Sequence, residues 1–139
     1  MSTKRSVRCD GQGLPLVFTL QPGHRHESLV FETLMDGGAI RRVGRGRPRL
    51  RPKRVCADKA YSNHRIRRWC RQHGVRVTIP RKANERRRGS FDREIYRQRA
   101  RVEQLFNRLK QYRRVATRYE KRASNYLAMV TIAAIWLFV

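Results

Sequence analysis

The sequence predicts an α/β domain, in which a β-sheet is covered by helices. Three observations support this class. Short apolar runs of strand length alternate with longer stretches of helical periodicity. Glycine, proline and capping residues stand between these runs, where turns and helix ends are expected. The chain has 139 residues, which is enough for one domain with a buried core.

The first two strands form a predicted hairpin. Residues 6–9 and 14–20 have strand length, and a turn over residues 10–13 separates them. Asp10 is explained by this turn, because aspartate side chains accept hydrogen bonds from the backbone that follows them. Residues 26–35 then predict a helix that ends at a pair of glycines.

The middle of the chain carries a basic loop, a short strand and a helix. Residues 41–54 contain eight cations in 14 residues, together with glycine and proline, and predict an exposed basic loop. The apolar run 55–57 predicts a buried strand with Asp58 at its end. Residues 62–73 predict a helix that is capped by Ser62 or Asn63, and residues 75–79 predict another strand.

Two helices complete the chain. A long helix is predicted over residues 90–119 and a last helix over residues 124–139. The apolar run Leu127–Val139 has 13 residues, fewer than the roughly 20 that span a bilayer, so we expect a buried helix there. Trp69 and Trp136 both fall on apolar helix faces, and we expect both in the core.

The composition points to a polyanionic partner. The chain has 34 Lys and Arg against 10 Asp and Glu, a formal net charge of +24. Arginine predominates, and its planar guanidinium suits phosphate groups, so nucleic acid is a better partner than a membrane surface. Three cysteines without a CxxC pair indicate a reducing compartment, the cytoplasm, and argue against a disulfide framework or a zinc site.

Among the acids, Asp58 and Glu103 are the candidates for chemistry. Asp58 follows a predicted strand, at the end where α/β proteins place ligands. Tyr96, Arg99, Glu103 and Lys110 share one helical face, which lies beside an apolar stripe. Taken alone, Glu103 is best explained as a surface acid paired with Arg99.

These residues also resemble a known pattern. The spacing Tyr-x2-Arg-x3-Glu-x6-Lys resembles the signature of bacterial insertion-sequence transposases of the DDE class. Ala57-Asp58-Lys59-Ala60-Tyr61 is similar to the run Ala-Asp-Lys-Gly-Tyr around that family's second catalytic aspartate, with alanine in place of glycine. Residues 22–28 are similar to the family's run Pro-Gly-x-x-His-Asp-Ser, with Glu27 in place of the aspartate. The resemblance extends from Thr3 to the end of the chain.

The resemblance implies a partial ribonuclease-H-like fold, a mixed sheet with flanking helices, in which residues 1–139 are part of one catalytic domain. It implies that Asp58 and Glu103 are catalytic and hold Mg²⁺ or Mn²⁺, with their carboxylates within roughly 4–7 Å of each other. It also implies that Tyr96, Arg99 and Lys110 contact DNA phosphates. Further phosphate contacts are predicted, from charge alone, for Arg86, Arg87 and Arg88.

The resemblance also implies a missing element. The family's first catalytic aspartate lies on a central strand upstream of the segment that matches Thr3-Lys4, so we expect that strand to be absent. An upstream transposase polypeptide would then supply the aspartate, with double-stranded DNA and further copies of the chain as the other partners. The expected function is DNA transposition, by metal-dependent cleavage and strand transfer of DNA at insertion-sequence ends.

Two other functions remain open at this point. The chain could be a non-catalytic basic DNA-binding fragment that modulates a full-length transposase. It could also be a basic RNA-binding structural protein. The separation of Asp58 and Glu103 distinguishes the metal-dependent function from both, because a shared metal site requires the two carboxylates to be close.

Overall fold

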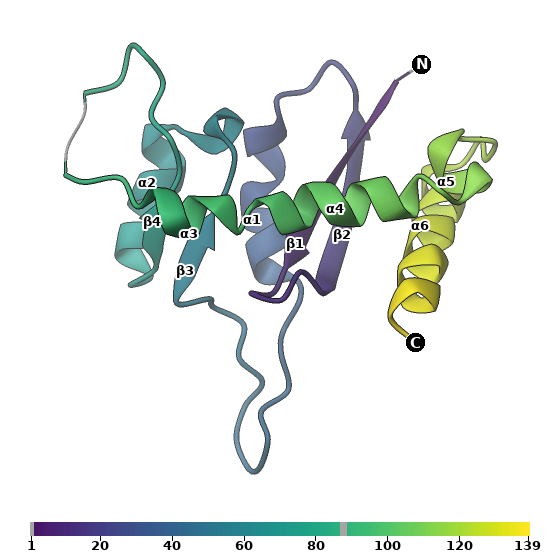
Figure 1. Cartoon of the computed structure of the whole chain (residues 1–139), viewed down its shortest axis with the longest axis horizontal. Helices are drawn as coiled ribbons and strands as arrows, with labels where there is room; N and C mark the ends of the chain where they lie inside the picture. Colours follow the sequence, from purple (N-terminus) through teal and green to yellow (C-terminus); the bar gives the residue numbers. More distant parts are fainter. Residues whose placement is uncertain (1, 87–88) are drawn as a thin grey trace.

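The structure is a computed structural model that describes residues 2–86 and 89–139 (Figure 1). Two pairs of strands lie behind a rod made by α3 and α4, and α6 lies at the far end of that rod. The strands are β1 (Thr3–Cys9), β2 (Pro15–Pro22), β3 (Arg54–Cys56) and β4 (Arg76–Thr78). The helices are η1 (Glu27–Val30), α1 (Phe31–Asp36), η2 (Lys59–Tyr61), α2 (His64–Gln72), α3 (Arg93–Arg97), α4 (Ala100–Leu109), α5 (Arg113–Ala116) and α6 (Ala123–Phe138).

The predicted hairpin is present. β1 and β2 pair antiparallel, from Thr3 opposite Pro22 to Cys9 opposite Pro15. The Asp10 carboxylate accepts hydrogen bonds from the backbone N–H of Gln12 (2.8 Å) and of Leu14 (2.9 Å). Asp10 therefore holds the turn, as its position in the sequence indicates.

The second pair of strands is parallel. β3 and β4 pair over three residues each, and α2 connects them. The Asn63 side chain accepts a hydrogen bond from Ile66 N at 2.9 Å, which identifies Asn63 as the N-cap of α2. Gly74, with φ of 66°, follows the helix and reverses the chain toward β4.

The mixed sheet without its first strand takes the form of two separate two-stranded sheets in the part of the chain that the structure describes, the antiparallel pair β1–β2 and the parallel pair β3–β4. Residues of β1 and of β3 line a common cavity of about 480 Å³. Neighbouring strands of one sheet lie about 4.8 Å apart, so ladder hydrogen bonds cannot bridge a space of this size. The finer assignment to a ribonuclease-H-like fold remains a prediction.

Two apolar clusters form the core. The first packs α1 and α2 against the β3–β4 pair and consists of Phe31, Leu34, Met35, Val55, Ile66, Cys70, Val75 and Ile79. The second packs α4, α5 and α6 against the face of the hairpin and consists of Leu105, Leu109, Val115, Tyr126, Val130, Ala133 and Ala134. Of the rod, α4 contributes Leu105 and Leu109 to the second cluster.

The single long helix predicted over residues 90–119 is wrong in two places. Between α3 and α4 the backbone N–H groups of Gln98, Arg99 and Arg101 each bond to the carbonyl three residues back, which is a tight 3-10 junction. Figure 1 shows that α3 and α4 stay in line across this junction. Beyond Leu109 the chain turns, because Val115, which is 1% exposed, packs into the second cluster.

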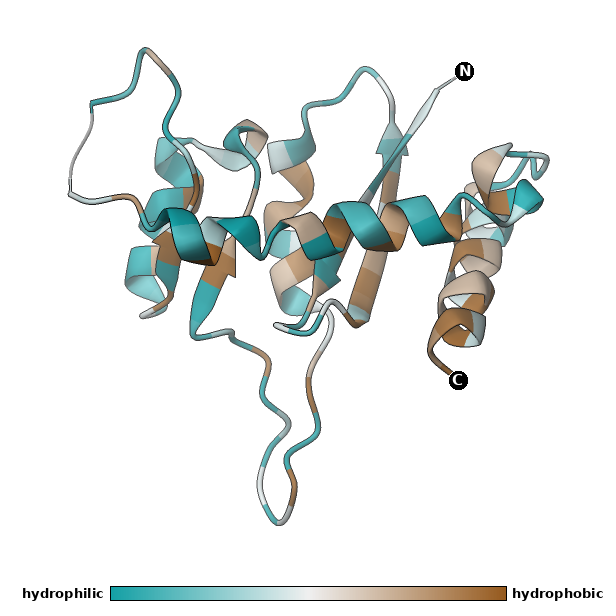
Figure 2. Ribbon diagram, viewed as in Figure 1, coloured by the Kyte–Doolittle hydropathy of each residue, from teal (hydrophilic) through white to brown (hydrophobic). Residues whose placement is uncertain are grey.

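The last helix is present as α6, but the expectation that it is buried is wrong for half of its surface. Trp136 is 76% exposed, and Ile132 and Ile135 are 57% exposed. Figure 2 shows that α6 is apolar around its circumference, so one face packs on the second cluster and the other has no cover. Trp69, in contrast, packs edge-on against Phe31 with ring centres 5.3 Å apart, as expected for a core residue. None of the helices in the described ranges is long and apolar enough to cross a membrane.

Candidate active site

Asp58 lies where the sequence places it, just beyond the end of a strand. β3 ends at Cys56, and Asp58 is the N-cap residue of η2 with extended backbone angles. Its side chain forms no capping hydrogen bond and is 48% exposed. The carboxylate is therefore available at the carboxyl end of the β3–β4 sheet, which is the edge where α/β proteins place ligands.

Arg99 brings Asp58 and Glu103 together. The same nitrogen of its guanidinium, Nη2, lies 3.4 Å from Asp58 Oδ2 and 2.8 Å from Glu103 Oε1. The two carboxylate oxygens are therefore no more than about 6 Å apart, and both residues line the cavity. This separation agrees with the distance expected from the sequence, while the role of the two acids as metal ligands stays a prediction.

Tyr96 completes the arrangement around Arg99. The Arg99 Nε group donates to the Tyr96 hydroxyl at 3.4 Å. Burial lowers the pKa of Arg99, but the Tyr96 hydrogen bond and the charges of Asp58 and Glu103 raise it, and the net change is a rise above the ordinary value. Arg99 is therefore a positive charge held between two carboxylates, of which Asp58 is 48% exposed and Glu103 62% exposed.

Lys110 is the member of the predicted face that stays apart. It is exposed at the C-cap of α4, and no hydrogen bond or ion pair of its ammonium group occurs among the residues described. Seven residues separate it from Glu103, which is about 10 Å along a helix axis. The structure thus unites Tyr96, Arg99 and Glu103 with Asp58, and places Lys110 farther along the same rod.

Two further acids, Asp10 and Glu27, line the same cavity as this pair. Glu27, at the start of η1, is among the lining residues together with Asp58 and Glu103. The charges of Glu27 and Asp58 both contribute to raising the pKa of Tyr61, although burial of that phenol is the larger cause. Glu27 has no role at the site in the sequence analysis, although it stands in the run of residues 22–28 where the resembled pattern has an aspartate.

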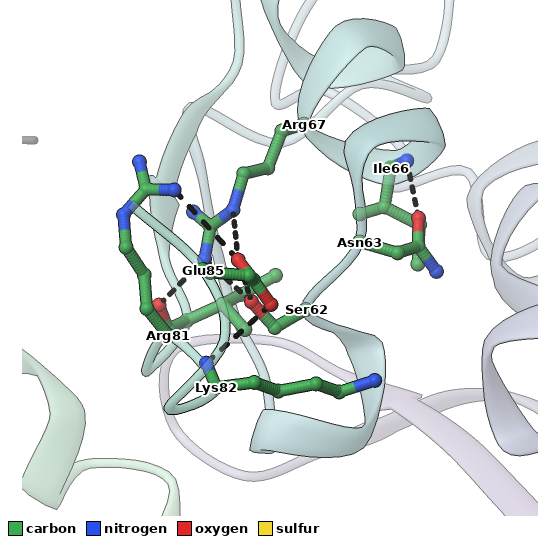
Figure 3. Close-up of polar contacts among 8 residues, drawn as sticks. Ser62, Asn63, Ile66, Arg67, Arg81, Lys82 and Glu85 are labelled. Carbon is green, nitrogen blue, oxygen red and sulfur yellow. Dashed lines mark hydrogen bonds and ion pairs between the residues drawn. The ribbon is translucent and has the colours of Figure 1, made fainter. Parts of the chain in front are cut away.

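The basic segment after β4 is fastened at its start (Figure 3). The Glu85 carboxylate accepts hydrogen bonds from the Ser62 hydroxyl (2.9 Å) and the Lys82 backbone N–H (3.4 Å), and lies 3.6 Å from Arg67 and 3.7 Å from Arg81. Burial raises the pKa of Glu85, but these hydrogen bonds and cations lower it, and the net shift is downward. Glu85 is therefore an ionised structural anchor between this segment and α2.

The predicted phosphate clamp of three arginines begins just beyond this anchor. Arg86 is exposed. Arg87 and Arg88 lie outside the described residues, so their predicted contacts with phosphate stay a prediction. The anchor at Glu85 fixes the point from which the clamp extends.

The donors at the site fit a hard divalent cation. Carboxylate oxygens are the ligands that Mg²⁺ and Mn²⁺ prefer, and Mg²⁺ commonly takes one or two carboxylates while keeping several waters and substrate phosphates. Asp58 and Glu103 supply two such groups at the required spacing. Across residues 2–86 and 89–139, no group of three or more His, Cys, Asp and Glu side chains is close enough to hold a metal ion by itself.

The chain is similar to known proteins along its whole length. Residues 1–138 match a family model described as a transposase DDE domain. The chain is 32% identical over 141 residues to a protein of Brucella ovis named as a transposase for insertion sequence element IS6501, and the match covers 99% of both chains. It is 28% identical over 130 residues to a protein of Burkholderia cepacia named as a transposase for insertion sequence element IS402, covering 94% of this chain and 59% of that protein. No solved structure matches.

Proposed function

The chain belongs to the transposase DDE domain family, and we propose that it contributes Asp58 and Glu103 to the cleavage and strand transfer of DNA at insertion-sequence ends. The observation that carries this proposal is the convergence of the two acids on Arg99 in the lining of the cavity. A role in DNA transposition follows from the family. The metal-dependent chemistry and the roles of individual residues are the proposal.

Asp58 and Glu103 would hold Mg²⁺ or Mn²⁺, which when bound neutralises charge on phosphate oxygens and makes water or a 3′ hydroxyl a better nucleophile. The chain's own residues have the remaining tasks. Arg99 balances the carboxylates when no other cation does, and its planar guanidinium can pair with two oxygens of a DNA phosphate instead. Tyr96 is a positioning residue, because its hydroxyl holds the Nε side of that guanidinium.

The site could accept a third carboxylate beside those of Asp58 and Glu103. Among the described residues, β1 pairs only with β2 and β3 only with β4, so each has a free edge; residues of both strands line the cavity together with Asp58 and Glu103. An added strand could pair with both edges and present its own side chain between the two acids. We therefore propose that a further polypeptide segment supplies this strand and the third carboxylate. Double-stranded DNA and additional copies of the chain are the other proposed partners.

A second candidate function is supported by the position of Arg99. Its guanidinium already pairs with both carboxylates, so the site is electrostatically satisfied without a metal ion. A chain in this state could bind DNA through its basic surface and modulate a complete transposase without cutting DNA. The positive charge of +24 supports binding in either case.

The two functions are separated by a cleavage assay on a supercoiled plasmid that carries insertion-sequence ends. The chain is supplied with Mg²⁺ or Mn²⁺, with and without a polypeptide that carries the proposed strand and its carboxylate. We expect nicking only when that polypeptide is present. Asp58→Asn and Glu103→Gln should each reduce the nicking rate by about two orders of magnitude or more, the scale at which loss of charge stabilisation affects rates. Glu94→Gln, which removes an exposed acid from α3, is the matched control and should cleave normally.

Cleavage that survives Glu103→Gln would refute the assignment of Glu103. If the chain binds DNA without a metal ion and does not cleave it, with or without the added polypeptide, the second candidate function, modulation of a complete transposase, would be favoured. Cleavage only in the presence of the polypeptide that carries the proposed strand would support the proposed third carboxylate.

A further inference from the structure

Residues 41–51 form an arm that projects from the body of the molecule between α1 and β3 (Figure 1). We refer to these residues as the basic arm. Its two sides are joined where Ile40 and Arg49 exchange backbone hydrogen bonds of 2.9 and 2.7 Å. Residues 41–51 are all exposed, and the Val43 side chain is as accessible as in an extended peptide. The arm therefore makes its surface available to a partner instead of contributing to the core.

The base of the arm is held rigidly by Arg8. This residue lies on β1 and is 8% exposed. Its guanidinium donates to the Leu50 carbonyl at 2.5 Å, at the base of the arm, and to the carbonyls of Met35 (3.1 Å) and Gly37 (2.7 Å) after α1. These charge-assisted hydrogen bonds fix the point from which the arm extends.

The tip of the arm is narrow and strongly basic. The arm has six arginines and no acid, and its tip carries the run Arg45-Gly46-Arg47-Pro48. Gly44 has φ of 100° and Gly46 has φ of 134°, conformations that a side chain would strain. Neither Arg45 nor Arg47 forms a hydrogen bond or ion pair with any residue that the structure describes. The unpaired guanidinium groups of Arg45 and Arg47 thus lie on either side of Gly46, which has no side chain.

We propose that the basic arm binds the minor groove of A·T-rich DNA, with Arg45 and Arg47 inserted into the groove. The minor groove is about 6 Å wide, so it admits a thin extended backbone but not a helix. A-tracts narrow it further and strengthen its negative potential, which attracts inserted arginine. G·C pairs place the guanine amino group in the groove and weaken that attraction. Arginine is favoured over lysine because its guanidinium is less strongly hydrated and loses less on entering the groove.

This inference rests on the proposed action on DNA and names the feature of the DNA that the arm recognises. An arm that contacted phosphates alone would bind through the same charges but would not distinguish base pairs. The two binding modes are therefore distinguished by comparing the affinity of the chain for two duplexes of equal length and equal phosphate number. One duplex has an A·T tract at its centre and the other has G·C pairs there.

The test measures binding of the full chain to both duplexes by fluorescence anisotropy, without divalent metal, at several salt concentrations. We expect about tenfold tighter binding to the A·T duplex, within the discrimination that groove contacts provide. The double substitution Arg45→Lys/Arg47→Lys keeps the charge, so we expect the salt dependence to be unchanged and the preference to fall below about twofold. Arg68→Lys/Arg71→Lys, on the exposed face of α2, is the matched control and should keep the preference.

Netropsin, which occupies the minor groove of A·T tracts, should displace the parent chain from the A·T duplex and remove the preference. Equal affinity of the parent chain for the two duplexes, or a preference that survives Arg45→Lys/Arg47→Lys, would overturn the inference. The arm is exposed, so these substitutions do not depend on refolding of the core. If the chain shows no A·T preference, the result of the cleavage assay is not affected. If the chain prefers A·T duplexes but does not cleave DNA, only the proposed catalytic function is overturned.

Discussion

Replacing Arg99 with glutamine should strengthen, not weaken, the binding of Mn²⁺ to the chain in the absence of DNA. The Arg99 guanidinium pairs with both Asp58 and Glu103. A metal ion that uses the same carboxylates must compete with it. Arg99→Gln removes the competitor and retains a polar side chain of moderate size, so the carboxylates become free for the metal.

The magnitude follows from the two ion pairs. Their distances are 3.4 and 2.8 Å, and the carboxylate side chains are 48% and 62% exposed. Ion pairs as exposed as these contribute about 0.2–1 kcal/mol each, so a metal ion has about 0.4–2 kcal/mol of competition to overcome. Removing it should raise the Mn²⁺ affinity by about two- to thirtyfold at low salt. The gain should shrink as salt rises, because exposed pairs are screened.

The assay is a Mn²⁺ titration followed by electron paramagnetic resonance, in which free Mn²⁺ gives the signal and bound Mn²⁺ does not. Arg97→Gln is the matched control, because it removes an exposed arginine of α3 whose guanidinium pairs with neither carboxylate in the described part of the chain. An unchanged or lower affinity in Arg99→Gln would refute the reasoning. An equal gain in Arg97→Gln would show that net charge alone is responsible.

Three further predictions concern stability and the exposed apolar surface. Arg8→Met removes the donor from the buried carbonyls of Leu34 and Met35 and from the part-buried carbonyl of Gly37, so the free energy of unfolding in urea should fall by about 2–4 kcal/mol. Burial raises the pKa of Cys70 from 9.0 to about 11, so between these pH values the folded chain keeps the thiol protonated while the unfolded chain releases the proton. The contribution of the thiol to stability is therefore complete below pH 9 and declines as the pH rises toward 11. In urea titrations at pH 8 and pH 10.5, the free energy of unfolding should fall less between the two pH values in Cys70→Ala than in the parent chain. Trp136→Gln should change the free energy of unfolding by less than about 0.5 kcal/mol and reduce light scattering by the purified chain, whereas Trp69→Gln should cost about 3 kcal/mol or more.

Much of the fold was predictable because local signals determine it. Asp10 defines the hairpin turn and Asn63 the start of α2 through hydrogen bonds to the next few residues, and such contacts depend on nearby sequence alone. The uncovered face of α6 was not predictable in this way. The helix is apolar on all sides, so its periodicity does not indicate which face is buried.

The break between α3 and α4 and the separation of the sheets had other causes. A 3-10 junction at Gln98 and Arg99 keeps the helix direction and nearly the same periodicity, so the sequence pattern hardly changes. The separation of β1 from β3 is not encoded by any run of residues in either strand; it was expected only from the resemblance, in which the absent first strand is central to the sheet.

The candidate site was predictable through its resemblance to a family more than through its periodicity. Asp58 and Glu103 lie far apart in the sequence, and their spacing within the family pattern identified both before their proximity was known. The helical face alone favoured a surface pair of Arg99 and Glu103. It also grouped Lys110 with them, because an angle around a helix contains no information on distance along it. Glu27 was not assigned to the site, because acids on a short helix are most simply explained as solvated surface charges.

The central claim is that Asp58 and Glu103 share one divalent cation, and a double-mutant cycle of Mn²⁺ affinity tests it most directly. Asp58→Asn, Glu103→Gln and the double variant are titrated with Mn²⁺ beside the parent chain, and circular dichroism confirms that each is folded. If both acids hold the same ion, each single substitution weakens binding at least tenfold and the double substitution weakens it much less than the product of the two. Effects that multiply, or a parent affinity that neither substitution changes, would contradict the claim.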